Sequence, residues 1–155
     1  MLKSISVETD KNDPPGRLLA LDLGTKTIGL AVSDPGRNIS SSLRIIQRRD
    51  MASDMAELAS VIEEYEIKEM VLGLPLHLSG AESEGSERSR KFAKELEAEF
   101  GLPVLLVDES LSTARAEEIM VQANVSRKKR KKKIDGLAAA VILQYYLDEQ
   151  EELNR

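Results

Sequence analysis

The first part of the chain contains closely spaced apolar runs. Residues 18–23 are almost continuously apolar, which is typical of a strand that is covered on both faces. A turn at Gly24 separates this run from a second one at 27–33, and a turn at 34–36 precedes a weaker strand pattern at 40–47. The pattern therefore predicts three strands joined by short turns.

The rest of the chain alternates between helical and strand patterns. Apolar residues recur at helical spacing over 50–66, and a short apolar run at 69–74 predicts a buried strand that ends before Pro75. The later expected elements are a helix capped by Ser86, a strand at 104–107, a helix that starts at Ser112 or Thr113, and a final helix over 134–149. The order βββαβαβαα indicates an α/β fold with a mixed five-stranded sheet and helices on both faces.

The ends of the chain fall outside this pattern. Residues 1–16 are polar and lack periodicity, so we expect a flexible amino-terminal arm, then one folded domain over 17–150 and a polar tail at 151–155. The absence of cysteine excludes disulfide scaffolds and thiol nucleophiles. No run reaches the ~18–20 apolar residues that span a bilayer, and no signal-peptide segment is present, so we expect a cytoplasmic protein without a membrane partner.

Charge changes this picture because it is unevenly distributed. The net charge of −5 taken alone argues against a nucleic-acid partner. However, residues 127–155 carry eight basic and five acidic side chains, whereas residues 1–126 carry 14 and 22. The basic excess comes from seven consecutive residues: Arg127, Lys128, Lys129, Arg130, Lys131, Lys132 and Lys133. Such a run fits a polyanionic substrate held through its phosphates, and an aromatic content of 3% favours backbone recognition over base stacking.

Three acidic positions are candidate functional residues. Asp22 interrupts an apolar strand, where an unpaired carboxylate would be costly to desolvate. Asp108 and Glu109 follow the fifth strand, and because successive strand side chains face opposite sides, only one of them can point towards Asp22. Asp135 lies in the first turn of the last predicted helix, where a carboxylate also complements the helix dipole. The residue pattern alone leaves both the choice within the pair and the role of Asp135 open.

Acids from a first strand, a later strand end and a helix start have a known chemical use. They can hold one or two Mg²⁺ or Mn²⁺ ions through hard oxygen ligands. Such ions activate the attacking water and stabilise the leaving oxygen in phosphodiester cleavage, so no histidine base is needed. The single histidine, His77, is interpreted as a loop residue that makes a polar contact. The chain has neither a complete phosphate-binding P-loop nor a serine-hydrolase elbow.

Taken together, these residues resemble the YqgF-type family of RNase H-like nucleases, whose members are named Holliday junction resolvases and pre-16S rRNA nucleases. The resemblance rests on four ordered segments, at 19–34, 71–80, 107–113 and 126–146. It implies an RNase H-like fold, which agrees with the predicted order of elements. It also implies that Asp22, Glu109 and Asp135 are the catalytic and metal-binding residues.

Three positions depart from the patterns of related proteins. Ser110 stands where the family has an arginine, and His77 stands where an asparagine is common. Ala138 lies where the better-known junction resolvases of this fold carry a second acid in the last helix. The loss of the arginine bears on substrate affinity more than on metal binding, whereas the missing acid makes the resolvase activity the less favoured of the two.

We therefore expect a metal-dependent nuclease for structured nucleic acid, with 5′-end processing of pre-16S rRNA in pre-ribosomal particles preferred over cleavage of branched DNA. Lys26 and residues 127–133 would position the substrate backbone. One alternative is a non-catalytic RNA-binding module of the same fold, which the serine at Ser110 motivates. A second alternative is a sugar-kinase- or actin-like ATPase, because residues 22–26 resemble the first phosphate loop of that superfamily. Both a monomer and a homodimer are compatible with the sequence.

Overall fold

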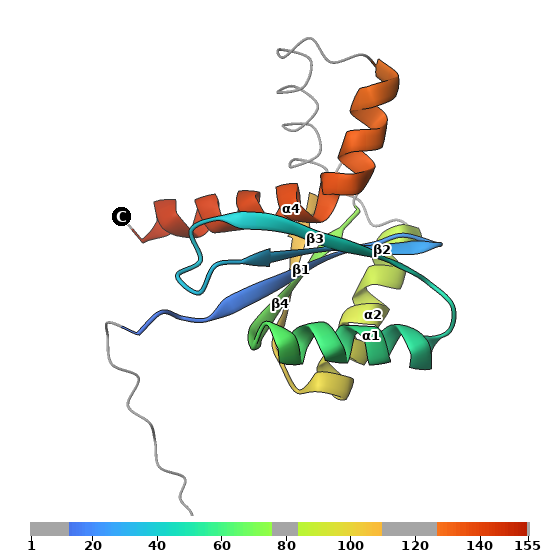
Figure 1. The fold of residues 1–155 in the computed structure, drawn as a ribbon, viewed down its shortest axis with the longest axis horizontal. Coiled ribbons are helices and arrows are strands. Elements are labelled where there is room, and N and C mark those ends of the chain that lie inside the picture. Colours follow the sequence, from blue (N-terminus) through green and yellow to red (C-terminus); the bar gives the residue numbers. More distant parts are fainter. Residues whose placement is uncertain (1–12, 76–83, 110–126, 155) are drawn as a thin grey trace, which may run out of the picture.

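The computed structural model describes residues 13–75, 84–109 and 127–154, including their side chains except those of 127–136. Within these ranges the elements are β1 (Arg17–Leu23), β2 (Thr27–Ser33), β3 (Ser40–Gln47), α1 (Met51–Glu64), β4 (Ile67–Leu74), α2 (Glu84–Phe100), β5 (Val104–Asp108) and α4 (Arg127–Leu153) (Figure 1). All five predicted strands are confirmed. The helix predicted to start at Ser112 or Thr113 lies outside the described residues.

The five strands form one mixed sheet in the order β3-β2-β1-β4-β5. The central strand β1 is antiparallel to β2 and parallel to β4, which is in turn parallel to β5. Since β1, β4 and β5 run in the same direction, their carboxyl ends meet at one edge of the sheet. Asp22, near the end of β1, and Glu109, directly after β5, therefore reach the same edge.

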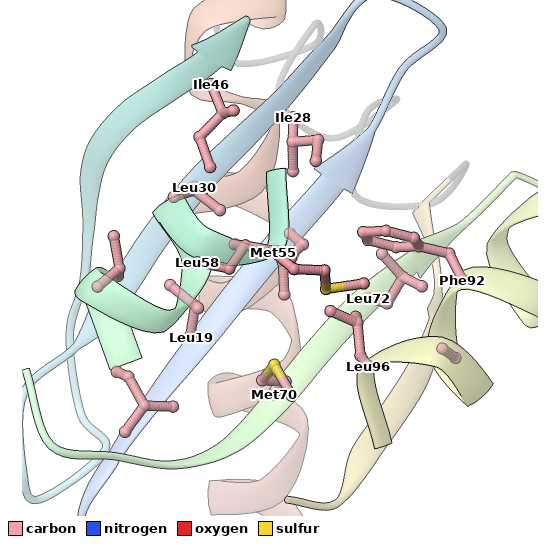
Figure 2. Close-up of a cluster of buried hydrophobic side chains, with 14 of the residues drawn as sticks. Leu19, Ile28, Leu30, Ile46, Met55, Leu58, Met70, Leu72, Phe92 and Leu96 are labelled. Carbon is pink, nitrogen blue, oxygen red and sulfur yellow. The ribbon is translucent and has the colours of Figure 1, made fainter. Parts of the chain in front are cut away.

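Both faces of β1 are buried, as the continuous apolar run predicted. Leu19 and Leu21 belong to a cluster that also contains side chains of α1 and α2, such as Met55 and Phe92 (Figure 2). The alternate residues of β1 belong to a second cluster, which includes Ala139, Ile142 and other apolar residues of α4. Figure 1 accordingly shows α1 and α2 on one face of the sheet and α4 on the other.

Two helix starts differ from the prediction. The helix α2 begins two residues before Ser86, which lies buried in the first turn, so the prediction that Ser86 caps this helix is wrong. The last helix begins at Arg127 rather than at Ile134, so the backbone of the basic run is helical. Lysine and arginine have high helix propensity, but a run without apolar residues shows no apolar periodicity. Within the described ranges, no helix combines the length and apolar composition needed to cross a bilayer.

Polar contacts fix α4 against the edge strand β3. The backbone N–H of Ser40 donates a hydrogen bond to Oε1 of Gln144 over 3.0 Å, and the Ser40 hydroxyl donates to the carbonyl of Ala140 over 2.9 Å. The side-chain amide of Gln144 also donates to the carbonyl of Asn38. These bonds set the position of the α4 segment that crosses the sheet. Figure 1 shows that α4 bends, and that its first turns extend away from the sheet.

Candidate active site

Two of the predicted acids meet at the carboxyl edge of the parallel strands. Asp22 alternates with Leu21 along β1, and so lies on the face of the sheet that α4 covers. Glu109 shares this face with Val107 of β5, which packs against the α4 cluster. The carboxyl groups of Asp22 and Glu109 form a hydrogen bond. The structure therefore brings Glu109, rather than Asp108, into contact with Asp22.

Gly29 lies beside Asp22 on the neighbouring strand β2, where the antiparallel register pairs the two residues. A Cβ atom built on Gly29 would lie 3.7 Å from the Cβ atom of Asp22 and 3.9 Å from that of Ala139 in α4. Both distances are ordinary van der Waals contacts. This side of Asp22 therefore has room for a small side chain.

Gly73 lies on the opposite side of Asp22, in β4. The parallel register pairs Leu21 with Leu72, so Gly73 follows at the level of Asp22. A Cβ atom built on Gly73 would collide with the Glu109 carboxylate. The sequence pattern predicted no role for Gly73, although a glycine inside an apolar strand is a known sign of close approach by another group. Gly73 thus provides the space that the Glu109 carboxylate occupies.

The contact between the two acids alters the charge state of the site. The pKa of Glu109 is raised to about 7, first by burial, and then by the negative charge of Asp22, the hydrogen bond with Asp22 and the charge of Asp108. Near neutral pH, Glu109 can therefore hold a proton and donate it in a hydrogen bond to Asp22. A divalent cation can replace that proton between two carboxylates, so these residues fit a hard ion such as Mg²⁺ or Mn²⁺.

The turn after Asp22 is fixed by Arg48, which follows β3. The Arg48 backbone N–H donates to the carbonyl of Lys26 over 2.9 Å, and its guanidinium Nη1 donates to the carbonyl of Gly24 over 2.8 Å. The guanidinium also pairs with the buried Asp54 at 3.6 Å and lies 5.9 Å from the centre of the Phe92 ring. Lys26 is exposed on this fixed turn. The sequence pattern did not predict a role for Arg48, because its contacts join segments that are distant in the sequence.

The side chains of the remaining predicted site residues lie outside the described part of the structure. Asp135 and the basic residues 127–133 lie in the first turns of α4, where the described part of the structure comprises the helical backbone only. His77 lies outside the described residues. Among the described side chains, no group of three or more His, Cys, Asp or Glu residues forms a potential metal site. Asp22 and Glu109 are the two described members of the predicted trio.

Comparison with known proteins identifies the family. Residues 16–149 match the profile of the RuvX family, which is described as Holliday junction resolvase. A relative from Koribacter versatilis is 47% identical over 133 residues, which cover 86% of this chain and 87% of the relative. A relative from Rhodobacter capsulatus is 45% identical over 90% of this chain and 88% of its own length. Both relatives carry the name "Putative pre-16S rRNA nuclease".

A solved structure supports the fold assignment. RuvC from Thermus thermophilus, in complex with a Holliday junction substrate, aligns with a TM-score of 0.52 and 14% sequence identity. The alignment covers 88% of this chain and 96% of RuvC. This likeness confirms the expected RNase H-like α/β fold. The family match and the relatives confirm the resemblance seen in the sequence: the chain belongs to the RuvX, or YqgF-type, family of RNase H-like nucleases.

Proposed function

We propose that the protein is a metal-dependent nuclease that hydrolyses phosphodiester bonds of structured nucleic acid, in the 5′-end processing of pre-16S rRNA. The observation that carries this proposal is the contact between the carboxyl groups of Asp22 and Glu109 at the carboxyl edge of parallel strands. Catalytic groups of α/β proteins gather at this edge. Two acidic side chains held in contact at this edge are typical of a divalent-cation site rather than of a structural ion pair.

Asp22 and Glu109 would hold the ion, with Asp135 as a third ligand supplied by α4. A bound Mg²⁺ or Mn²⁺ would lower the pKa of the attacking water and stabilise the charge that develops on the leaving oxygen. Glu109 must first give up its proton, because only the carboxylate is a ligand. Lys26 and the basic residues 127–133 would hold the substrate backbone through its phosphates, and so orient the cleaved bond.

Two observations favour ribosomal RNA precursors as the substrate. The relatives at 45–47% identity carry the name of pre-16S rRNA nucleases. In addition, Ala138 provides no second acid in the last helix. We therefore place the reaction on pre-ribosomal particles in the cytoplasm. The second candidate is cleavage of four-way DNA junctions, which the description of the matched family favours.

The test compares cleavage of a pre-16S rRNA fragment and a four-way DNA junction in the presence of Mg²⁺ or Mn²⁺. Asp22→Asn and Glu109→Gln should abolish cleavage, because each removes a charged metal ligand while nearly preserving the shape of the side chain. Asp108→Asn is the matched control, since it neutralises the neighbouring acid, whose side chain alternates with that of Glu109 along the chain, and it should retain activity. Wild-type activity in Asp22→Asn would refute the mechanism.

Metal titration separates the nuclease from a non-catalytic RNA-binding module. If the protein is a metal-dependent nuclease, Mn²⁺ or Mg²⁺ should bind to the wild-type protein and should bind much more weakly to Glu109→Gln. Salt-sensitive RNA binding without any metal binding would instead favour the module. The preferred RNA substrate would be refuted if the wild-type protein cleaved the DNA junction and left the pre-16S rRNA fragment intact.

A further inference from the structure

A basic groove lies at the end of β1, on the face of the sheet that α2 covers. Its volume is about 170 Å³, and its lining includes Leu23 of β1, Arg48, and several residues of α2. The α2 residues that line it are Arg88, Lys91, Phe92 and Glu95. Three cations thus surround this groove, against one acid. We call it the α2 groove.

The α2 wall of the groove presents two cations on a fixed backbone. Arg88 and Lys91 are three residues apart, and therefore lie on the same face of the helix. Phe92 beside them is buried in the larger apolar cluster, which sets the rotation of α2 about its axis (Figure 2). Both cations are exposed, and within the described ranges neither forms an ion pair with an acidic side chain. Their charge is therefore available to a ligand.

Another wall of the groove is formed by Arg48, which is held rigidly. The Arg48 guanidinium is bound to the carbonyl of Gly24, paired with Asp54 and placed over the Phe92 ring. Because Asp54 neutralises Arg48, this wall contributes mainly shape. The net positive charge of the groove comes from Arg88 and Lys91, which outweigh the single acid Glu95.

The groove lies close to the acidic pair. Leu23 lines the groove and directly follows Asp22 in β1, so the two side chains face opposite sides of the same strand end. One residue of a β-strand advances the backbone by only about 3.3 Å, and each strand of a duplex carries one phosphate per about 3.4 Å of helix axis. Consider a substrate strand that has one phosphate at Asp22 and continues around the end of β1. Another of its phosphates, no more than roughly three nucleotides away along the strand, would then reach the groove.

We propose that the α2 groove binds a backbone phosphate of the nucleic-acid substrate, a few nucleotides from the cleaved bond, and that Arg88 and Lys91 are its ligands. The proposal rests on the proposed function for the identity of the ligand. It places substrate contacts on both faces of the sheet, whereas the residues predicted from the sequence, Lys26 and 127–133, lie in the β1–β2 turn and α4. A nucleic acid fits better than an acidic protein, because the groove is lined by Leu23, the residue that directly follows Asp22, in a member of a nuclease family.

Charge removal with a matched control tests the proposal. Arg88→Gln/Lys91→Gln removes the two groove cations, and Arg90→Gln/Lys94→Gln removes two cations of the same helix that do not line the groove. Both pairs are introduced into Asp22→Asn protein, so that binding is measured without cleavage. The groove pair should weaken binding of a pre-16S rRNA fragment about tenfold and lower the salt slope by about one to two, whereas the control pair should change affinity less than about twofold.

Cross-linking gives the position of the contact. Because the chain has no cysteine, Arg88→Cys introduces a unique thiol, and Arg90→Cys supplies the control. The RNA carries one thiol-reactive group on a single backbone phosphate, stepped away from the cleaved bond. We expect cross-linking from Arg88→Cys only when the group is within the first few nucleotides. Equal cross-linking from both variants would refute the assigned contact.

The possible failures can be distinguished. If wild-type protein neither binds nor cleaves the RNA fragment or a four-way DNA junction, the proposed function and the groove assignment both fail. If wild-type protein cleaves, but the groove pair binds nucleic acid as tightly as the control pair, only the groove assignment fails, and an acidic protein becomes the better candidate ligand. When the two pairs are introduced into wild-type protein instead, Mn²⁺ titration of the groove pair should match that of the control pair, which shows that Asp22 and Glu109 are undisturbed.

Discussion

A Cβ atom placed on Gly73 would lie 2.5 Å from Oε2 of Glu109 and 2.8 Å from Cδ1 of Ile142. Non-bonded atoms do not approach this closely, so a side chain at this position would force its neighbours to move. The absence of a side chain on Gly73 therefore allows Glu109 to reach Asp22. The glycine on the other side of Asp22, Gly29, would make only ordinary contacts if it carried a Cβ atom. The two glycines flank one carboxylate but differ in what a methyl group would displace.

Gly73→Ala should therefore weaken metal binding, whereas Gly29→Ala should not. The added methyl group must displace the Glu109 carboxylate or the Ile142 side chain, and overpacking of this kind costs about 1–3 kcal/mol of stability. We expect the Mn²⁺ affinity of Gly73→Ala to fall at least about tenfold, and that of Gly29→Ala to stay within about twofold. Isothermal titration of metal-free protein with Mn²⁺, alongside thermal melts, measures both effects.

A second substitution identifies the cause of this loss. Glu109→Asp shortens the side chain and withdraws its carboxylate from the added methyl group. In the Gly73→Ala background it should therefore recover part of the thermal stability, although in wild-type protein the same change should weaken Mn²⁺ binding. If both glycine variants bind Mn²⁺ equally well, Gly73 has no part in positioning Glu109.

The affinity for Mn²⁺ should depend on pH through Glu109. Its pKa is raised to about 7, chiefly by burial and by the charge of Asp22, so below that pH the ion must displace a proton. We expect affinity to fall nearly tenfold for each pH unit below about 7 and to level off above it. Titrations in buffers with different ionisation enthalpies should detect release of about one proton per ion at low pH. Glu109→Gln should show no such release.

Glu109→Gln should also stabilise the metal-free protein at alkaline pH. The pKa of Glu109 rises from 4.5 to about 7 on folding. The stability that the folded protein gains from protonation of Glu109 is therefore fully present below about pH 4.5 and is lost as the pH rises through 7. At pH 8 the wild-type protein must keep two carboxylates in contact. Glutamine relieves this repulsion, and because the site is partly solvated we expect a gain of about 1–2 kcal/mol.

Urea unfolding in the presence of a chelator measures this gain. The advantage of Glu109→Gln over the wild-type protein should be present at pH 8 and absent near pH 4.5. Asp108→Asn, which changes the same charge next to the site, should give a smaller effect, because the Asp108 charge is the smallest of the causes that raise the Glu109 pKa. An equal pH dependence of stability in wild-type protein and Glu109→Gln would contradict the shifted pKa.

The sequence predicted the strands well because burial on both faces leaves a direct pattern. The run at 18–23 indicated a covered central strand, and strand alternation indicated that either Asp108 or Glu109 could face Asp22 but not both. It could not decide between them, because the choice depends on the register of β5 against β4, which pairs Leu74 with Asp108. Register is a property of two segments and is not contained in either one.

Prediction from the sequence failed where polar segments form helices. The basic run and the start of α2 have no apolar periodicity, so neither helix start could be located. The α2 groove was also missed, because Leu23 and Arg88 are brought together by the packing of α2, through Phe92, Ala93 and Leu96, against the sheet. The contact between Arg48 and Gly24 spans 24 residues and follows from the pairing of β2 with β3.

The ion pair between Arg48 and Asp54 gives a final prediction, about the turn that follows Asp22. The Asp54 side chain is 4% exposed and the Arg48 side chain 25% exposed, so Arg48→Gln leaves a buried charge without its partner and also removes the bond to Gly24. The expected cost is about 2–3 kcal/mol in urea unfolding. Asp54→Asn in the same protein should restore part of this loss, since it removes the unpaired charge.

Arg49→Gln is the control for this prediction. The pair between Arg49 and Glu57 has a similar distance, 3.4 Å, but the Arg49 side chain is 67% exposed, so its loss should cost no more than about 0.5 kcal/mol. If the β1–β2 turn positions the acidic pair, Arg48→Gln should also lower the turnover rate more than it raises KM, and Arg49→Gln should change neither. Equal losses of stability in the two variants would contradict the predicted contribution of Arg48, which combines a buried ion pair with the bond to Gly24.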